Sequence, residues 1–156
     1  MTIKTPDLGF EPKGLFIGGE WVRARLVSGP DGAPVAEKFP HQGAGEADVD
    51  AAVAAAREAF PAWAALPASA RAEHLVRLAD AIDEHVDDLA LMDAVDSGNA
   101  VSGMRGDMEW TSQTYRFFAG LVTEIKGETM SREPGHLNLT LRQPYGVVAK
   151  INPFNH

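Results

Sequence analysis

The chain has 156 residues, of which 45% are hydrophobic and 23% charged, which is ordinary for one soluble globular domain. Its formal net charge of -8 disfavours binding to nucleic acid and to anionic membrane surfaces. The sequence contains no cysteine, which excludes disulfides, thiolate metal sites and a cysteine nucleophile within the chain.

The N-terminal region carries no targeting signal that can be read from its sequence. Residues 1–13 contain Pro6, Gly9 and Pro12 and are predicted to form a loose arm. No basic start followed by a long apolar run is present, so no signal peptide is expected. No window approaches the ~18 apolar residues of a membrane helix. The prediction is a soluble, cytoplasmic protein that does not contact membranes.

Short strands are predicted next. Leu15–Ile17 and Trp21–Val22 flank the pair Gly18–Gly19, and this pattern is typical of a β-hairpin because both central residues of a tight primed turn need positive φ. A second strand pair is predicted at residues 25–27 and 35–39, which flank a Gly-Pro-Asp-Gly turn signal.

From Glu46 the apolar period becomes helical. Alanine, a strong helix former, fills much of this stretch. The apolar face has spacings of three and four residues and comprises Val49, Val53, Ala56, Phe60 and Trp63. A proline inside a helix costs about 3 kcal/mol. Pro61 therefore predicts an end or a kink at Phe60.

Two further helices are predicted. Ser69 is the expected N-cap of the second, which ends at Ser97-Gly98-Asn99. Its apolar stripe comprises Leu75, Leu78, Ile82, Val86 and Leu89. The third helix has Gly127 as its expected C-cap. Its apolar seam, interpreted as core or subunit interface, comprises Met104, Met108, Thr111, Tyr115, Phe118, Val122 and Ile125.

The pattern returns to strands near Gly135. Leu137, Leu139 and Leu141 alternate with polar residues, which predicts a half-buried strand. A second apolar run, residues 147–151, is rich in β-branched residues. The predicted order is short strands, three helices and two strands, with nothing to close the sheet. Unpaired edges on such apolar strands indicate that partner strands are missing.

Metal and phosphate sites are not predicted. The five histidines include no pair at i+3 or i+4, and His74 and His85 would lie about 16 Å apart along a helix. No Gly-x-Gly-x-x-Gly or Gly-x-x-x-x-Gly-Lys-Ser/Thr motif is present. Asp87–Asp88 and the acidic group around Glu46 are interpreted as solvated helix faces, the latter favoured by the helix dipole.

The C-terminal stretch resembles a known family. Residues 142–155 read Arg-Gln-Pro-Tyr-Gly-Val-Val-Ala-Lys-Ile-Asn-Pro-Phe-Asn. They resemble the aldehyde dehydrogenase superfamily, whose familiar form is Arg-x-Pro-x-Gly-Val-Val, then isoleucine, then Pro-Trp-Asn. Phe154 stands where tryptophan is commoner, and Asn152 where an apolar or small residue is common. The resemblance is specific because several uncommon choices coincide at fixed spacing.

Weaker landmarks extend the resemblance over residues 14–156, in the family's order. Leu15–Val22 is similar to the opening strand pair of the family, and Val49–Trp63 is similar to its alanine-rich helix. Three further segments are similar to later helical landmarks of the family: Asp96–Asn99, Gly106–Asp107 and Arg116–Gly120.

The resemblance implies an oxidoreductase that converts an aldehyde to a carboxylic acid with NAD or NADP. A cysteine thiolate attacks the carbonyl, hydride passes to the nicotinamide, and water releases the acid. Asn155 matches the asparagine whose side-chain amide donates to the oxyanion. Ile151, Pro153 and Phe154 match positions that line the cofactor cleft. From its residue type alone, Asn155 would be a turn residue or the N-cap of a following helix.

The resemblance also implies that the chain alone is inactive. The family's cysteine nucleophile, glutamate base, cofactor lysine and most of its dinucleotide-binding sheet lie downstream of the matching part. The expected fold class is α/β, the N-terminal part of an aldehyde dehydrogenase fold. Its expected division is an arm (1–13), strands and helices of the cofactor-binding domain (14–134), an oligomerisation-type β-ribbon (135–151) and the truncated motif (152–156). A homo-oligomer is expected for the full-length enzyme.

Two alternatives stay open. The second hypothesis is a short structural or interaction module that acts through its ribbon, and the third is a non-functional remnant that misfolds. Neither alternative involves a metal ion or nucleic acid as partner.

Overall fold

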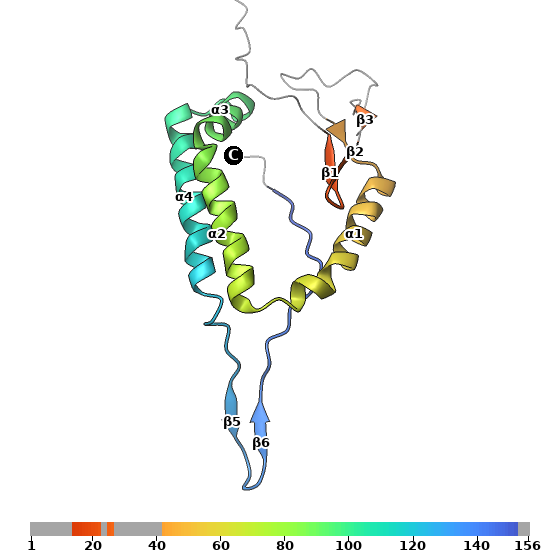
Figure 1. The fold of residues 1–156 in the computed structure, drawn as a ribbon, viewed down its shortest axis with the longest axis vertical. Coiled ribbons are helices and arrows are strands. Elements are labelled where there is room, and N and C mark those ends of the chain that lie inside the picture. The colour runs from red at the N-terminus through yellow and green to blue at the C-terminus, as the bar shows by residue number, and fades with distance from the viewer. Residues whose placement is uncertain (1–13, 23–24, 27–41, 153–156) are drawn as a thin grey trace, which may run out of the picture.

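The computed structural model describes residues 14–22, 25–26 and 42–152 (Figure 1). Four helices and six short strands occur in these ranges. The strands are β1 (Leu15–Ile17), β2 (Glu20–Val22), β3 (Arg25–Leu26), β4 (Gln42–Gly43), β5 (Thr129–Ser131) and β6 (Leu137–Leu139). The helices are α1 (Glu46–Ala64), α2 (Ala68–Glu84), α3 (Val86–Ser97) and α4 (Val101–Gly120).

The hairpin predicted around the glycine pair is confirmed. β1 and β2 are antiparallel, with Phe16 opposite Trp21, and the two rings lie 5.0 Å apart between centroids. Gly18 and Gly19 have φ of 63° and 90°, the left-handed region that a primed turn requires. In the second predicted pair, Arg25–Leu26 is a strand but its partner is β4. The strand predicted at 35–39, like the arm at 1–13, lies outside the described residues.

Helix α1 begins at Glu46, where the Asp48 carboxylate accepts the backbone N–H of Gly45 at 2.9 Å. Pro61 predicted an end or a kink at Phe60, and of these two outcomes the end does not occur, because α1 continues to Ala64. Only one turn follows the proline. That turn is held by backbone hydrogen bonds from Ala65 to Pro61 and from Leu66 to Trp63. The backbone N–H that Pro61 lacks is therefore not needed in the turn that follows it.

The long second helix of the prediction is two helices, so the predicted count of three becomes four. A break at His85 separates α2 from α3, and the apolar stripe continues across it, which hides the break from a periodicity argument. Ser69 is not the N-cap of α2. The helix begins beyond Pro67, whose carbonyl accepts the N–H of Arg71 at 3.1 Å. The predicted stop is confirmed, since Gly98 caps α3 with φ 82°.

Helix α4 packs against both α2 and α3, and the core of the described residues lies at these contacts. Met104 of the predicted seam is buried against Ala90 and Ala94 of α3. Ser112 and Ala119 are buried farther along α4. Gly127 is not its C-cap. The helix ends at Gly120, with Leu121 as cap.

Gly127 has a different role, at the base of the hairpin formed by β5 and β6. A Cβ there would collide with the carbonyl of Thr140, so only glycine allows this close approach of the two arms of the hairpin. The N–H of Thr140 donates to the Glu128 carbonyl at 2.8 Å. The predicted strand at Leu137 is confirmed for Leu137–Leu139, but residues 147–151 form no strand because no described segment pairs with them.

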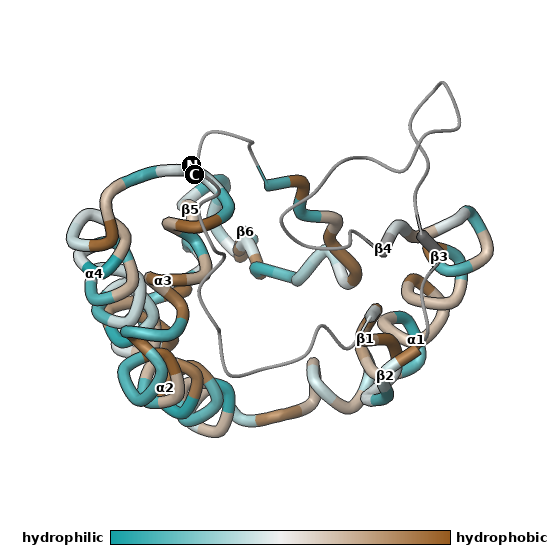
Figure 2. The backbone as a smooth tube through the Cα atoms, turned by 90° about the horizontal axis from the view of Figure 1, so that it is seen from above, coloured by the Kyte–Doolittle hydropathy of each residue, from teal (hydrophilic) through white to brown (hydrophobic). Residues whose placement is uncertain are grey.

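The fold is therefore α/β, with two groups of elements. Figure 1 and Figure 2 show α2, α3 and α4 on one side and α1 with β1 and β2 on the other, with the segment after β6 passing between them. The β5–β6 hairpin protrudes beyond the helices (Figure 1). Many large apolar side chains are exposed on both groups, Trp110 and Phe117 of α4 among them.

Candidate functional site

Of the four predicted site residues, the structure places one. Ile151 lies outside any helix or strand and is 93% exposed. Pro153, Phe154 and Asn155 lie outside the described residues. The structure thus brings none of the four together, and the predicted oxyanion donor and cofactor-lining roles are not tested by it.

The segment that leads to this motif leaves the hairpin at a fixed point. The Glu128 N–H donates to Thr140 Oγ1 at 2.8 Å, which adds to the Thr140 backbone bond and ties the two arms of the hairpin together. The chain then reaches Gly146, whose φ is 99°. An ideal Cβ on Gly146 would lie 3.7 Å from Cε1 of Phe60, so the α1 ring covers this glycine.

Beyond Gly146 the segment runs along an apolar face of α1. Val147, Val148 and Ala149 line a groove of about 360 Å³ together with β1 residues and the α1 residues Val49 and Val53. Burial falls off along the segment, because Val147 is 37% exposed and Val148 is 73% exposed. The first part of the α1 stripe predicted from the sequence thus faces the C-terminal segment, whereas Trp63 at its end packs on His74 of α2.

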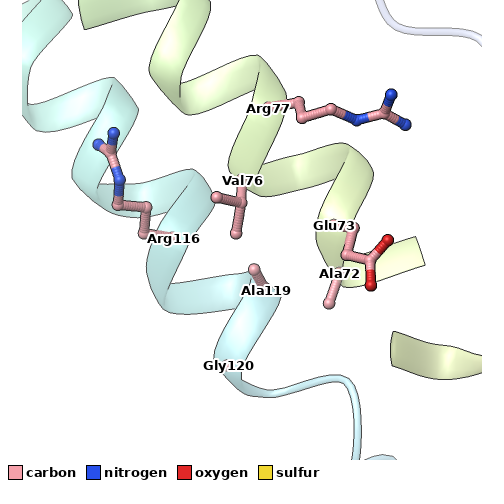
Figure 3. Close-up of a pocket in the computed structure, with 7 residues that line it drawn as sticks. All are labelled: Ala72, Glu73, Val76, Arg77, Arg116, Ala119 and Gly120. Carbon is pink, nitrogen blue, oxygen red and sulfur yellow. The ribbon is translucent and has the colours of Figure 1, made fainter. Parts of the chain in front are cut away.

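A second groove lies between α2 and α4 and has a volume of about 630 Å³. Figure 3 shows its floor, where Val76 of α2 faces Ala119 of α4. The charged groups of Arg77 and Arg116 point away from this floor and away from each other (Figure 3). Catalysis of a polar reaction needs convergent polar groups, and this groove has none. We interpret it as the outer rim of the helix packing.

The polar cluster at the same helix pair is structural. Arg116 of α4 contacts Asp80 and Asp83 of α2, each at 2.7 Å. The Ser112 hydroxyl, and then Arg116, hold the pKa of the Asp83 carboxyl below its ordinary value. Asp80, and then Asp83, raise the pKa of Arg116. All three charged side chains are well exposed to solvent, so each pair stabilises the packing only weakly.

Two absences apply to the described residues alone. No group of three histidine, cysteine, aspartate or glutamate side chains in residues 14–22, 25–26 and 42–152 is placed to hold a metal ion. Within the same ranges, no helix has the length and apolar character needed to cross a bilayer.

Sequence reasoning missed the contact between Phe60 and Gly146. Phe60 was assigned only to the apolar face of a helix, and Gly146 only to the stretch 142–155 that resembles the family. No local signal in the sequence points to this contact, because Gln143-Pro144-Tyr145-Gly146 reads as a turn by itself. Contact across 86 residues cannot be read from local spacing.

Comparisons with known proteins identify the family. The sequence model described as the aldehyde dehydrogenase family matches residues 30–156. A putative aldehyde dehydrogenase-like protein of Schizosaccharomyces pombe is 36% identical over 151 residues, covering 94% of this chain and 30% of its own length. The 5-carboxymethyl-2-hydroxymuconate semialdehyde dehydrogenase of Escherichia coli is 39% identical over 112 residues, covering 71% of this chain and 24% of its own length.

The fold agrees with this assignment. The solved structure of PnpE in complex with nicotinamide adenine dinucleotide superposes with a TM-score of 0.68 and 36% identity, covering 81% of this chain and 27% of that one. The chain thus spans about 30% of the length of the relatives it matches, and its elements correspond to an N-terminal part of their fold. The chain belongs to the aldehyde dehydrogenase family.

Proposed function

We propose that these residues form part of an enzyme that oxidises an aldehyde to a carboxylic acid with NAD or NADP. The observation that carries the proposal is the family match over residues 30–156, which includes the whole Gly-Val-Val to Pro-Phe-Asn stretch. Two relatives support the chemistry, since one is named a semialdehyde dehydrogenase and another is described in complex with nicotinamide adenine dinucleotide. A cytoplasmic location is proposed on composition alone.

The proposed role of this chain within that reaction is to supply an oxyanion donor. Attack of a thiolate on the aldehyde carbon places negative charge on the carbonyl oxygen. The side-chain amide of Asn155 then donates a hydrogen bond to that oxygen, which lowers the barrier because the donor is already in position. The bound nicotinamide cofactor would accept the hydride in such a reaction.

We further propose that the 156 residues do not catalyse this reaction alone. The chain has no cysteine to act as nucleophile. The described residues also do not fit a dinucleotide by themselves. Ile151 is almost fully exposed and lines neither of the two grooves described above, and no phosphate-binding glycine loop is present. Ile151, Pro153 and Phe154 would supply one wall of a cofactor cleft whose other wall comes from elsewhere.

The hairpin is proposed to act in subunit association. It protrudes from the helices, and Leu137, Leu139 and Leu141 are all exposed along it (Figure 1). The ribbon proposed for residues 135–151 includes β6, but its other strand in this structure is β5, which begins at Thr129. Pairing of two such hairpins would cover both the leucines and the open strand edges, which favours a homo-oligomer.

A chimaera tests the enzymatic role. Residues 14–156 replace the corresponding part of the E. coli relative, and NADH formation is followed with an aldehyde substrate of that relative. Activity is expected, and Asn155→Ala should lower kcat by about 10² to 10³, the usual cost of an oxyanion donor. Gln113→Ala, an amide truncation on the exposed side of α4, is the matched control. Equal activity of the two variants would contradict the role of Asn155.

The isolated chain tests the alternatives. We expect no NADH formation from it with any aldehyde. The exposed leucines of the hairpin favour one alternative, an interaction module, and a monodisperse oligomer with cooperative unfolding would support it. Aggregation would support the non-functional remnant. Measuring the intact mass of the product in its native cells adds a check, since a mass of 16.7 kDa would favour these alternatives over the enzyme.

A further inference from the structure

Helix α4 carries a second apolar face, which the other described residues leave exposed. This outer face comprises Trp110, Phe117, Phe118 and Leu121, which are 69%, 63%, 55% and 36% exposed. Trp110, Phe117 and Leu121 follow one another after two turns and then one turn of helix, so they form one stripe. The rings of Phe117 and Phe118 meet edge to face, with 5.5 Å between their centroids. The stripe is therefore a continuous aromatic surface.

The outer face lies opposite the side of α4 that forms the core. Ser112 and Ala119 are buried, and each stands two positions after a residue of the outer face, about 200° round the helix axis. Both α2 and α3 pack against α4, and Figure 2 shows them on one side of it. On the other side an ideal Cβ on Gly106, four residues before Trp110, would meet nothing within 4 Å. The described residues thus use one side of α4 and leave the opposite side uncovered.

The charges of α4 do not suit an anionic partner. The helix has two basic residues, Arg105 and Arg116, and each of them contacts two carboxylates. A helix that lies on a lipid surface presents lysine and arginine beside its apolar face, and binding to nucleic acid requires cations that neutralise phosphates. Both arginines of α4 are already neutralised by carboxylates. The outer face therefore fits an apolar protein surface.

The length of the relatives points to the source of that surface. The family match over residues 30–156 includes α4, yet the chain spans only 30% of the Schizosaccharomyces pombe relative and 27% of the PnpE chain. A buried aromatic side chain covers about 150 to 250 Å². Apolar patches of more than a few hundred Å² on a soluble protein mark interaction sites. Three aromatic rings on one helix face form a patch of that size.

We infer that the outer face of α4 is the interface through which these residues bind the part of the proposed enzyme that lies beyond residue 156. This inference rests on the proposed function only in taking these residues as part of a longer polypeptide. The leucines of the β5–β6 hairpin are a separate apolar surface, proposed above for association between subunits. In the enzyme, α4 is thus covered by α2 and α3 on one side and by the rest of the polypeptide on the other.

Hydroxyl-radical footprinting with mass spectrometry tests the inference, because it measures the solvent access of individual side chains. The sample is the chimaera with the E. coli relative. Phe16 of β1 is the matched control, since it is the same residue type as Phe117 and is 61% exposed. In the chimaera, Phe117 should be oxidised about fivefold more slowly than Phe16, because interface cores are packed as densely as protein interiors. Equal rates would overturn the inference.

The isolated chain distinguishes this partner from a second copy of the same residues. There Phe117 should be oxidised about as fast as Phe16, because nothing covers the outer face. Met104, which is 4% exposed, should react far more slowly than Met130, which is 48% exposed, as expected for a folded α4. Protection of Phe117 relative to Phe16 in the isolated chain would assign the outer face to a second copy and would overturn the inference.

Substitution tests the same surface through stability. Phe117→Ala should lower the Tm of the chimaera by about 4 °C because it removes a buried ring. In the isolated chain, where Phe117 is exposed, the Tm should stay nearly unchanged. Phe16→Ala is the control and should have the same effect in both proteins. A chimaera that forms no NADH but protects Phe117 would contradict the proposed function and support the inference. An active chimaera in which both substitutions lower the Tm equally would overturn the inference alone.

Discussion

Replacing Met104 by alanine should be among the most costly single changes in the described part of the chain. The Met104 side chain is 4% exposed and packs against Ala90, Ala94 and the half-buried Met108. Its sulfur also lies 3.9 Å from Nδ2 of Asn99. Truncation to alanine forfeits about 2 kcal/mol of transfer free energy. The cavity left behind adds about 24 cal/mol for each Å³ that is not filled.

The neighbours decide how much of that cavity stays open. Ala90 and Ala94 have no rotatable side chain with which to fill it, whereas Met108 can shift in part. We therefore expect a loss of about 3 kcal/mol in the free energy of unfolding, within the range seen for such changes. Urea unfolding followed by far-UV circular dichroism measures it, because the signal reports the loss of the helices, α3 and α4 among them.

Met130 of β5 provides the matched control, since the same residue type is 48% exposed there. Met130→Ala should change the free energy of unfolding by no more than about 0.5 kcal/mol. A loss below about 1 kcal/mol at Met104, or equal losses at both sites, would falsify the assignment of Met104 to the core. The absence of a cooperative transition in the unsubstituted chain would refute it as well.

Two further predictions concern α3 and α2. Gly98→Ala should destabilise the chain by about 1 kcal/mol because the φ of Gly98 is 82°, although the space around it is open. The control is Gly106→Ala, inside α4 and equally open, which should stabilise the chain by about 0.5 kcal/mol. Thermal unfolding of both variants measures the two changes. Because the pKa of Asp83 is held below its ordinary 3.8 in the folded chain, its contribution to stability is present above pH 3.8 and is lost as the pH falls below that value. Asp83→Asn should therefore flatten the acid limb of the stability profile, and an unchanged limb would contradict the assignment.

Local chemistry made some elements predictable from the sequence. The Gly18–Gly19 pair specified the first hairpin because two consecutive left-handed residues are nearly unique to one kind of turn. Gly98 was predictable as a helix stop because helices commonly end on a left-handed residue, and that residue is usually glycine. Elements whose limits depend on neighbours in space were not predictable. The break at His85 lies between two helices that both pack against α4, and the periodic stripe carries no trace of it.

In the candidate site, too, residues of a local motif could be assigned from the sequence, whereas residues whose contacts are distant in the sequence could not. Ile151 and residues 153–155 were assigned from a motif, and the structure locates Ile151 of these without testing any role. Gly127 was misread as a helix cap because its close approach to Thr140, 13 residues later, depends on the chain reversal between β5 and β6. Phe60 and Gly146 are separated by 86 residues, and no spacing rule links them. Contacts between residues far apart in the sequence thus could not be predicted from the local sequence pattern.

The helix packing implies an order of folding. α3 and α4 are joined by a short connection, so their contacts close a small loop at little entropic cost. α2 reaches α4 only across a longer span, as the 36 residues between Asp80 and Arg116 show. On the ribosome, α2 therefore emerges first and waits roughly 2 to 7 seconds for its partner at ordinary rates of synthesis. The α3–α4 pair is expected to form before α2 docks, and the apolar face of α2 is the surface that a chaperone would meet during that interval.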